Sequence, residues 1–212
     1  MKEHGILFSS EMVRALLAGT KTQTRRLIRV DDTPIAERDA KALRYQRGIP
    51  SNAQNVRFDG YQYLKCDAPP GSATVSSRVM APHQPQQILW CRETFADGYS
   101  DPLCVIDGVQ HFRPIYRADA PGAKKPSDVP GSKVCADRWT PGIHMPRWAS
   151  RITLRVTSVR VERVQTITEE DARAEGVDGR DAYTALWDVI NGKTAPWASS
   201  PWVWVYAFER VQ

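Results

Sequence analysis

The expected fold class follows from the stretch Ile152-Thr153-Leu154-Arg155-Val156-Thr157-Ser158-Val159-Arg160-Val161-Glu162-Arg163-Val164, in which apolar and polar residues alternate. Successive side chains of a strand point to opposite faces, so a period of two gives one apolar face and one polar face. The phase of this alternation changes between Val156 and Val159. The stretch therefore predicts one long β-strand, or two strands joined at a bulge.

Downstream of this strand, the sequence predicts two helices and a final strand. Thr168 is suited to cap the first helix, the acidic residues 169–171 favour its positive end, and Glu175-Gly176 closes it. A second amphipathic helix is expected from Asp181 to Ile190, and a strand from Trp202 to Phe208.

Upstream, the sequence predicts a strand, and an N-terminal helix that leads into a basic block. Gln87 to Phe95 reads as a strand. Ser9 and Ser10 can cap a helix whose apolar side includes Leu16, and Gly19 is placed to end that helix in a left-handed turn.

Strands separated by long loops, together with three short helices, predict an α+β fold with a small β-barrel and flanking helices. We expect one domain over residues 1–212, with long loop insertions at about 31–87 and 97–147. The first insertion contains a possible hairpin at Val56–Leu64, because Asp59-Gly60 is a turn signal.

Composition indicates an ordinary globular protein with an anionic partner. Hydrophobic residues make up 42% of the 212 residues, charged residues make up 25%, and the net charge is +5. The four cysteines show no CxxC spacing, and His111 and His144 have no partner at metal-ligand spacing, so we expect neither a disulfide framework nor a metal site. No membrane-spanning run or signal-peptide layout is present, and we expect a cytoplasmic protein without a membrane partner.

The basic block Gly19-Thr20-Lys21-Thr22-Gln23-Thr24-Arg25-Arg26 is the first candidate site. Lysine, hydroxyl and guanidinium groups after a glycine-ended helix provide several donors that can converge on one anion. The spacing of a P-loop is absent. A solvent-exposed basic turn is the alternative, and composition alone favours it.

Two further features are candidates. Trp90, Arg92 and Glu93 end an apolar strand, where they could line a cleft, or where the charged pair could be a simple ion pair at a barrel rim. Glu175 lies in the last turn of its helix, where the helix dipole disfavours a carboxylate, which hints that another interaction retains it. A surface position is the alternative, and the residue taken alone favours it. Most tryptophans of the C-terminal half are expected in the core, although some could stack on a base.

Three stretches in this order resemble the ASCH family, a branch of the PUA-like superfamily. The first is Leu17–Arg26, which is similar to the family's Gly-x-Lys-Thr-x-Thr-x-Arg signature, and the second is Leu89–Phe95. The third runs from Ser150 through Glu169–Gly176 to the strand at Trp202–Val205. Together they cover roughly half of the chain. The layout is similar to larger ASCH proteins of phages and prophages, which implies the cytoplasm of a bacterium or of a phage-infected host cell.

The resemblance implies a PUA-like barrel with a cleft facing the signature. Some small ASCH proteins hydrolyse the acyl group of N4-acetylcytidine with a lysine, a threonine and a glutamate. The matching positions are Lys21 as the base, Thr24 as the nucleophile and Glu175, which would orient the amine or relay the proton to the leaving nitrogen. Arg26 or a backbone N–H would stabilise the oxyanion. The residues expected to bind the substrate in this cleft are Arg25, Arg26, Trp90, Arg92 and Glu93.

Other ASCH proteins bind RNA or act as ribonucleases, so the fold alone does not fix the function. The expected partner is a nucleoside, a nucleotide or RNA, with DNA as a further possibility, and no cofactor is expected. One alternative to the amidohydrolase is a non-catalytic RNA- or DNA-binding module. The other is a metal-independent ribonuclease.

Overall fold

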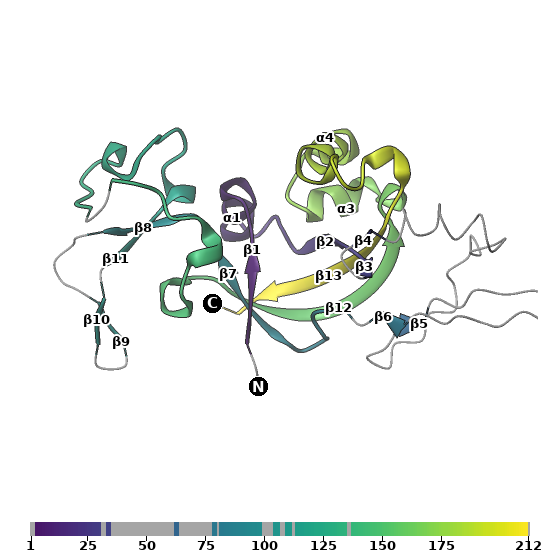
Figure 1. Ribbon diagram of the computed structural model, residues 1–212, viewed down its shortest axis with the longest axis horizontal. Helices are drawn as coiled ribbons and strands as arrows, with labels where there is room; N and C mark the ends of the chain where they lie inside the picture. The colour runs from purple at the N-terminus through teal and green to yellow at the C-terminus, as the bar shows by residue number, and fades with distance from the viewer. Residues whose placement is uncertain are drawn as a thin grey trace, which may run out of the picture. The chain divides into compact units, whose positions relative to one another are not determined.

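The computed structural model describes residues 3–30, 33–34, 62–63, 78–79, 81–98, 104–106, 109–111, 113–134 and 137–211 (Figure 1). Five strands share one sheet in the hydrogen-bonded order β1-β7-β12-β13-β2. Their bounds are β1 (His4–Leu7), β2 (Gln23–Leu27), β7 (Ile88–Arg92), β12 (Thr153–Arg163) and β13 (Trp202–Arg210). The α-helices are α1 (Ser10–Leu17), α3 (Glu169–Ala174) and α4 (Gly179–Asn191).

Shorter elements complete the described secondary structure. Two-stranded pairs are formed by β3 (Arg29–Val30) with β4 (Thr33–Pro34), β5 (Gln62–Tyr63) with β6 (Arg78–Val79), β9 (Cys104–Ile106) with β10 (Val109–His111), and β8 (Phe95–Gly98) with β11 (Arg113–Tyr116). Single 3-10 turns are η1 (Arg117–Asp119), η2 (Pro126–Asp128), η3 (Gly142–His144), η4 (Arg147–Ala149), η5 (Val164–Thr166) and η6 (Trp197–Ser199).

The mixed α+β class expected from the sequence is confirmed. In the five-stranded sheet, β1 pairs parallel with β7, whereas the β7–β12 and β13–β2 pairs are antiparallel. Among the described strands, β1 and β2 are the two ends of this sheet, so these strands form an open sheet and not a closed barrel. A PUA-like barrel therefore stays a prediction.

The chain divides into two compact units. Unit 1 comprises residues 1–22, 87–155 and 208–212, and unit 2 comprises residues 23–86 and 156–207. The prediction of a single domain over 1–212 stays a prediction. The expected hairpin at Val56–Leu64 lies outside the described residues, apart from β5, which pairs with β6.

The expected N-terminal helix of unit 1 is confirmed as α1. Ser9 Oγ accepts a hydrogen bond from the Met12 N–H at 3.4 Å, which caps the first turn. Val13 and Leu16 are buried on the apolar side of the helix. Gly19 has φ +76°, the left-handed conformation that glycine adopts without strain, and its N–H donates to Leu16 O. The basic block therefore leaves the helix through a fixed turn.

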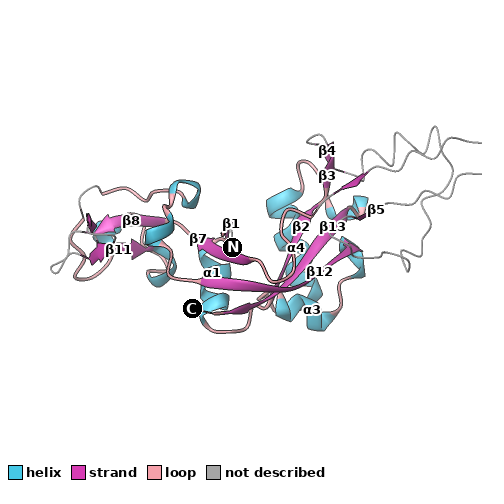
Figure 2. Ribbon diagram, turned by 90° about the horizontal axis from the view of Figure 1, so that it is seen from below, coloured by secondary structure: helices cyan, strands magenta, loops and turns pink. Residues whose placement is uncertain are grey.

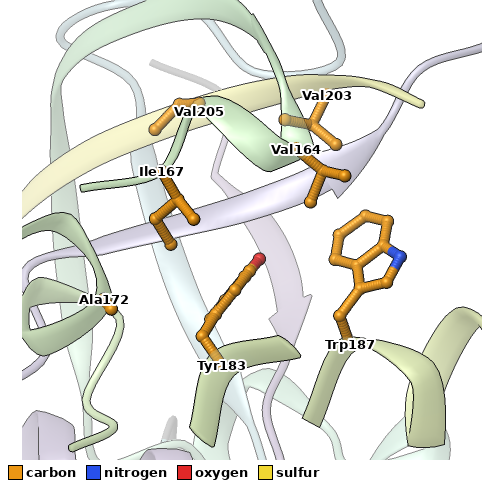
Figure 3. Packing of buried hydrophobic residues seen from close by; sticks show 7 residues of the cluster. All are labelled: Val164, Ile167, Ala172, Tyr183, Trp187, Val203 and Val205. Carbon is orange, nitrogen blue, oxygen red and sulfur yellow. The ribbon is translucent and has the colours of Figure 1, made fainter. Parts of the chain in front are cut away.

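In unit 2, α3 and α4 lie on the same side of β2 and β13 (Figure 1). Tyr183 and Trp187 of α4 point towards Val203 and Val205 of β13, and Val164 packs in the same cluster (Figure 3). These side chains bury apolar area, which stabilises the packing by roughly 25 cal/mol for each Å² removed from water. Val203 and Val205 therefore lie on the face of β13 that α4 covers.

The long strand predicted at 152–164 is confirmed as a single element, β12. Thr157 and Ser158 are both exposed at the point where the alternation changes phase, and the strand continues through them. The strand predicted at 87–95 ends earlier, at Arg92, and Phe95 begins β8 instead. In unit 1, Figure 2 shows β8 and β11 side by side, and short helical turns lie near them.

Candidate functional site

Four polar residues of the basic block are almost completely buried. Lys21, Gln23, Thr24 and Arg25 are each at most 5% exposed. The alternative of a solvent-exposed basic turn is therefore wrong for these residues. Burying polar or charged side chains is costly unless each one is hydrogen-bonded or paired, so their partners decide what the segment can do.

Arg25 of β2 is the centre of an ion cluster in unit 2. Its Nη1 donates to Glu175 Oε1 at 3.1 Å, and its Nη2 donates to Asp171 Oδ2 at 2.8 Å and to Glu162 Oε2 at 3.2 Å. The side chain of Arg25 is completely inaccessible to solvent. Burial alone would lower the pKa of this guanidinium, but the negative charges of its carboxylate neighbours hold the pKa above its ordinary value. Arg25 is therefore charged, and its two terminal nitrogens are engaged, whereas its buried Nε has no hydrogen-bond partner among the described residues.

Arg160 of β12 completes the ion cluster, which we define as Arg25, Arg160, Glu162, Asp171 and Glu175. Arg160 donates to Asp171 Oδ1 at 3.1 Å and also pairs with Glu162. Because two guanidinium groups face three carboxylates, the cluster has one negative charge in excess.

Asp171 links α3 to β2 through a second contact. Gln23 Nε2 donates both to Asp171 O and to Asp171 Oδ1, each at 2.9 Å. Burial would raise the pKa of Asp171, but the hydrogen bond from Gln23 and the charges of Arg25 and Arg160 lower it below its usual value. The first turn of α3 is thus fixed to the strand by both backbone and side-chain hydrogen bonds.

Glu175 follows α3 directly and is only 2% exposed. Its N–H donates to Asp171 O at 2.9 Å, and Gly176 then turns the chain with φ +86°. The sequence left open a surface position for Glu175 or an interaction that retains a carboxylate at this end of a helix, and the surface position is wrong. The charged hydrogen bond from Arg25 is such an interaction.

Thr24 and Arg26 lie on the other face of β2. Because side chains alternate along a strand, they point away from the face that carries Gln23 and Arg25. In the antiparallel register, Thr24 is opposite Tyr206 and Arg26 is opposite Trp204 of β13. We call this side of the β2–β13 pair the aromatic face, and define it by Thr24, Arg26, Trp202, Trp204 and Tyr206.

The aromatic face is enclosed by aromatic and cationic groups. The His83 and Tyr206 rings are 5.3 Å apart in an edge-to-face arrangement. The Arg163 guanidinium lies 4.2 Å from the Trp202 ring centroid. Burial raises the pKa of the Tyr206 hydroxyl well above its ordinary value, so this group is a neutral phenol.

The remaining predicted site residues belong to unit 1. Lys21 Nζ lies 5.7 Å from the Phe8 ring centroid, and the Lys21 N–H donates to Ala15 O at 3.1 Å. The Arg92 guanidinium lies 5.2 Å from the ring centroid of Trp90 and donates to the Ile143 carbonyl. In unit 1 the structure therefore brings together Trp90 and Arg92.

Glu93 is paired with an arginine that the sequence did not indicate. Arg151 donates to both carboxylate oxygens of Glu93, at 2.9 and 3.1 Å, and to both oxygens of Asp119, at 2.7 and 2.8 Å. Burial raises the pKa of Glu93 above its ordinary value, although the hydrogen bonds and charge of Arg151 oppose that shift. The Arg151 guanidinium also lies 3.9 Å from the Tyr116 ring centroid.

Sequence reasoning missed the partners Arg160, Glu162 and Asp171. Asp171 was explained by the helix dipole alone. A usable signal was present: residues 160 and 162 share one face of a strand, and so do residues 23 and 25. What the sequence could not provide was the pairing of the two faces, which are more than a hundred residues apart along the chain.

Among the residues that the structure describes, no group of three or more histidine, cysteine, aspartate and glutamate side chains could hold a metal ion. None of the helices in the described part of the chain is long and apolar enough to span a bilayer.

Comparison of the chain with protein-family models, with curated proteins and with solved structures found no match.

Proposed function

We propose that this chain binds a nucleobase-bearing ligand, as an ASCH-like protein of PUA-like fold, and that the aromatic face forms one wall of the binding site. The observation that supports this is the β2–β13 register, which sets Thr24 against Tyr206 and Arg26 against Trp204. Aromatic rings stack on bases, and a guanidinium binds phosphate through several N–H donors. Thr24, Trp204 and Tyr206 are each at most 2% exposed, whereas Arg26 is partly exposed. Arg26 is therefore the group of this face that a ligand reaches first, and the buried rings form the surface behind it.

Arg25 has a positioning role in this proposal. Its guanidinium has no solvent-accessible surface and is already bound by three carboxylates. It cannot bind a ligand phosphate without giving up one of these charged hydrogen bonds. Arg25 instead fixes α3 on the helix side of β2, and thereby holds the strand that carries Thr24 and Arg26 on its opposite face.

Hydrolysis of an N-acyl amide on a modified cytidine is the second candidate. Its support is that Lys21, Thr24 and Glu175, the positions that match the ASCH catalytic set, are all buried polar residues. Thr24 Oγ would attack the acyl carbonyl while Lys21 accepts its proton. The amino group of the base would leave with a proton, and water would then release the acyl group from Thr24. The role of Lys21 rests on the sequence resemblance alone.

Binding ranks above hydrolysis because of strand geometry. Glu175 is held by Arg25, and Arg25 and Thr24 are neighbours on a strand and so face opposite sides. A direct proton transfer between Thr24 and Glu175 is therefore not part of the proposal. Glu175 would act on the reaction through Arg25 and the position of β2.

The test of binding uses isothermal titration of the full chain with cytidine, cytidine 5′-monophosphate and a short single-stranded RNA. Arg26→Gln is expected to weaken binding of the phosphate-bearing ligands about tenfold, because a charged hydrogen bond contributes roughly 1.5 kcal/mol or more. The control is Arg155→Gln, which removes an exposed arginine paired with Glu209. Absence of binding to all three ligands, or equal losses in the two variants, would refute the proposal.

The test of hydrolysis follows N4-acetylcytidine by chromatography. Turnover by the wild type that is lost in Lys21→Ala and Thr24→Ala supports the amidohydrolase, whereas binding without turnover supports the binding module. Cleavage of the RNA in the presence of EDTA would instead identify a metal-independent ribonuclease. If all the variants keep the wild-type rate, the catalytic assignment is wrong.

A further inference from the structure

A pocket lies in unit 1, and all of its lining residues belong to the insertion 97–147. Its volume is about 420 Å³. That is within the range of about 300–1,000 Å³ typical of small-molecule sites. The pocket is formed by the β8–β11 pair, by η1 and by the loop at 129–133. This insertion therefore builds a site of its own.

One wall of the pocket is held rigidly. The Tyr116 hydroxyl donates to Ala149 O at 2.8 Å, and its ring lies against the Arg151 guanidinium. Arg151 is fixed in turn by paired hydrogen bonds to Glu93 and Asp119. Both oxygens of Asp119 accept from Arg151, but Arg151 also pairs with Glu93, so one guanidinium offsets only part of the charge of the two carboxylates.

The space at the base of the wall depends on a glycine. A Cβ at Gly98 would lie 2.6 Å from Arg113 O and 2.8 Å from Ile115 Cγ1, so a side chain does not fit there without movement of the backbone. Gly98 also forms a β-bridge with Val134, which ties the 129–133 loop to the strand pair. The close approach of the β8 and β11 backbones at Gly98 therefore shapes this part of the pocket.

The lining combines apolar surface with two cations. Pro114, Ile115 and Val129 are partly buried apolar residues of the lining. Arg113 and Lys133 are exposed, and neither makes an ion pair with any residue that the structure describes. A flat ring can cover the apolar surface and the Tyr116 wall, while an anion offsets the two positive charges.

We propose that this pocket binds a phosphate monoester that carries a flat aromatic or heterocyclic body. A guanidinium and an ammonium group together suit a phosphate dianion, because the first provides a planar set of donors and the second a compact charge. A volume of about 420 Å³ accommodates a ligand of about the size of a mononucleotide. This binding is independent of the function proposed for the aromatic face.

The test is isothermal titration of the full chain with phenyl phosphate and with adenosine 5′-monophosphate. Adenosine and inorganic phosphate serve as the comparisons that lack one half of the ligand. Arg113→Gln and Lys133→Gln are each expected to weaken binding about fivefold, since each removes one charged contact at an exposed position. Lys124→Gln makes the same charge change at an exposed residue of the same insertion outside the pocket, and is expected to have no effect.

A further variant blocks the space without removing a charge. Pro130 is exposed and lines the pocket, so Pro130→Trp should abolish binding while the melting temperature stays close to that of the wild type. The proposal is overturned if neither phosphate monoester binds at millimolar concentration. It is equally overturned if adenosine binds as tightly as its phosphate, or if Pro130→Trp leaves the affinity unchanged.

Discussion

Arg25 and Arg151 both hold buried carboxylates, but the two arrangements differ at the level of single residues. Arg25 is the inaccessible member of its group, and its partners Glu162 and Asp171 keep partial contact with solvent. In the other group the carboxylate is the buried member, because Glu93 is 1% exposed while Arg151 remains partly accessible. Removal of one charge should therefore have different consequences in the two places.

Substitution of Arg25 should destabilise the fold strongly. Arg25→Gln leaves Glu175 and Asp171 without their main cation, and breaking a buried ion pair from one side costs about 3–5 kcal/mol. Equilibrium denaturation measures this loss. Arg155→Gln, which removes an exposed pair with Glu209, should change the unfolding free energy by less than about 1 kcal/mol. Similar values for the two variants would contradict the central position of Arg25.

Glu93 should make stability depend on pH in a defined direction. Its pKa is raised in the folded protein, so the native state binds the proton more tightly than the unfolded state does. The stabilisation from this proton is complete below the ordinary glutamate pKa of about 4.3 and is lost as the pH rises through the folded pKa. The difference in unfolding free energy between wild type and Glu93→Gln should fall over that window. A difference that rises with pH would show the shift to be in the opposite direction.

At the scale of elements, α3 is a six-residue helix whose two ends are both fixed. Thr168 Oγ1 accepts from the Asp171 N–H at 3.1 Å at the first turn, and Gly176 adopts a left-handed conformation after the last. So short a helix is unstable in isolation. Its end contacts and its packing against β2 therefore determine whether Glu175 is held in place.

The cap of α3 can be tested separately from the ion cluster. Thr168→Ala should lower the unfolding free energy by about 0.5–2 kcal/mol, because it leaves an N–H of the first turn without its acceptor. Thr168→Ser keeps the hydroxyl and should retain most of the stability. Denaturation of the three proteins under one set of conditions makes the comparison. An equal loss in both variants would mean that the methyl group, and not the cap, is responsible.

Elements with a local signal were predictable from the sequence. The Ser9 cap, the Gly19 turn and the period of two in β12 each depend on residues that are near one another in the chain. The ion cluster was not predictable, because Arg25 and Glu162 meet through strand pairing over a long sequence separation. The ion pair of Glu93 was not predictable for the same reason. Arg92 is its neighbour in the chain, but its partner in the fold is the distant Arg151.

At the scale of the whole molecule, the net charge of +5 favours anionic partners without selecting one. Two anion-binding sites are proposed, one on the aromatic face of unit 2 and one in the insertion pocket of unit 1. Salt dependence distinguishes a polyanion that releases many counterions from a small ligand that contacts one or two charges.

Binding of single-stranded RNA should therefore weaken steeply with salt. For about three phosphate contacts, affinity should fall roughly twentyfold between about 50 and 200 mM salt. Arg26→Gln should reduce the slope of log affinity against log salt by about 0.7, the loss of one contact. Fluorescence anisotropy with a labelled oligonucleotide measures both quantities. An unchanged slope would place Arg26 away from the phosphates.

The Arg25 ion cluster also constrains how this sequence can diverge. Because one guanidinium satisfies carboxylates from β12 and from both ends of α3, a change at position 25 is tolerated only when positions 162, 171 and 175 change with it. A substitution at only one of these positions leaves a buried charge unpaired, and the cost in stability opposes it. Descendants of this chain should therefore keep the whole set or replace it together, and paired substitutions at these positions should show strong epistasis.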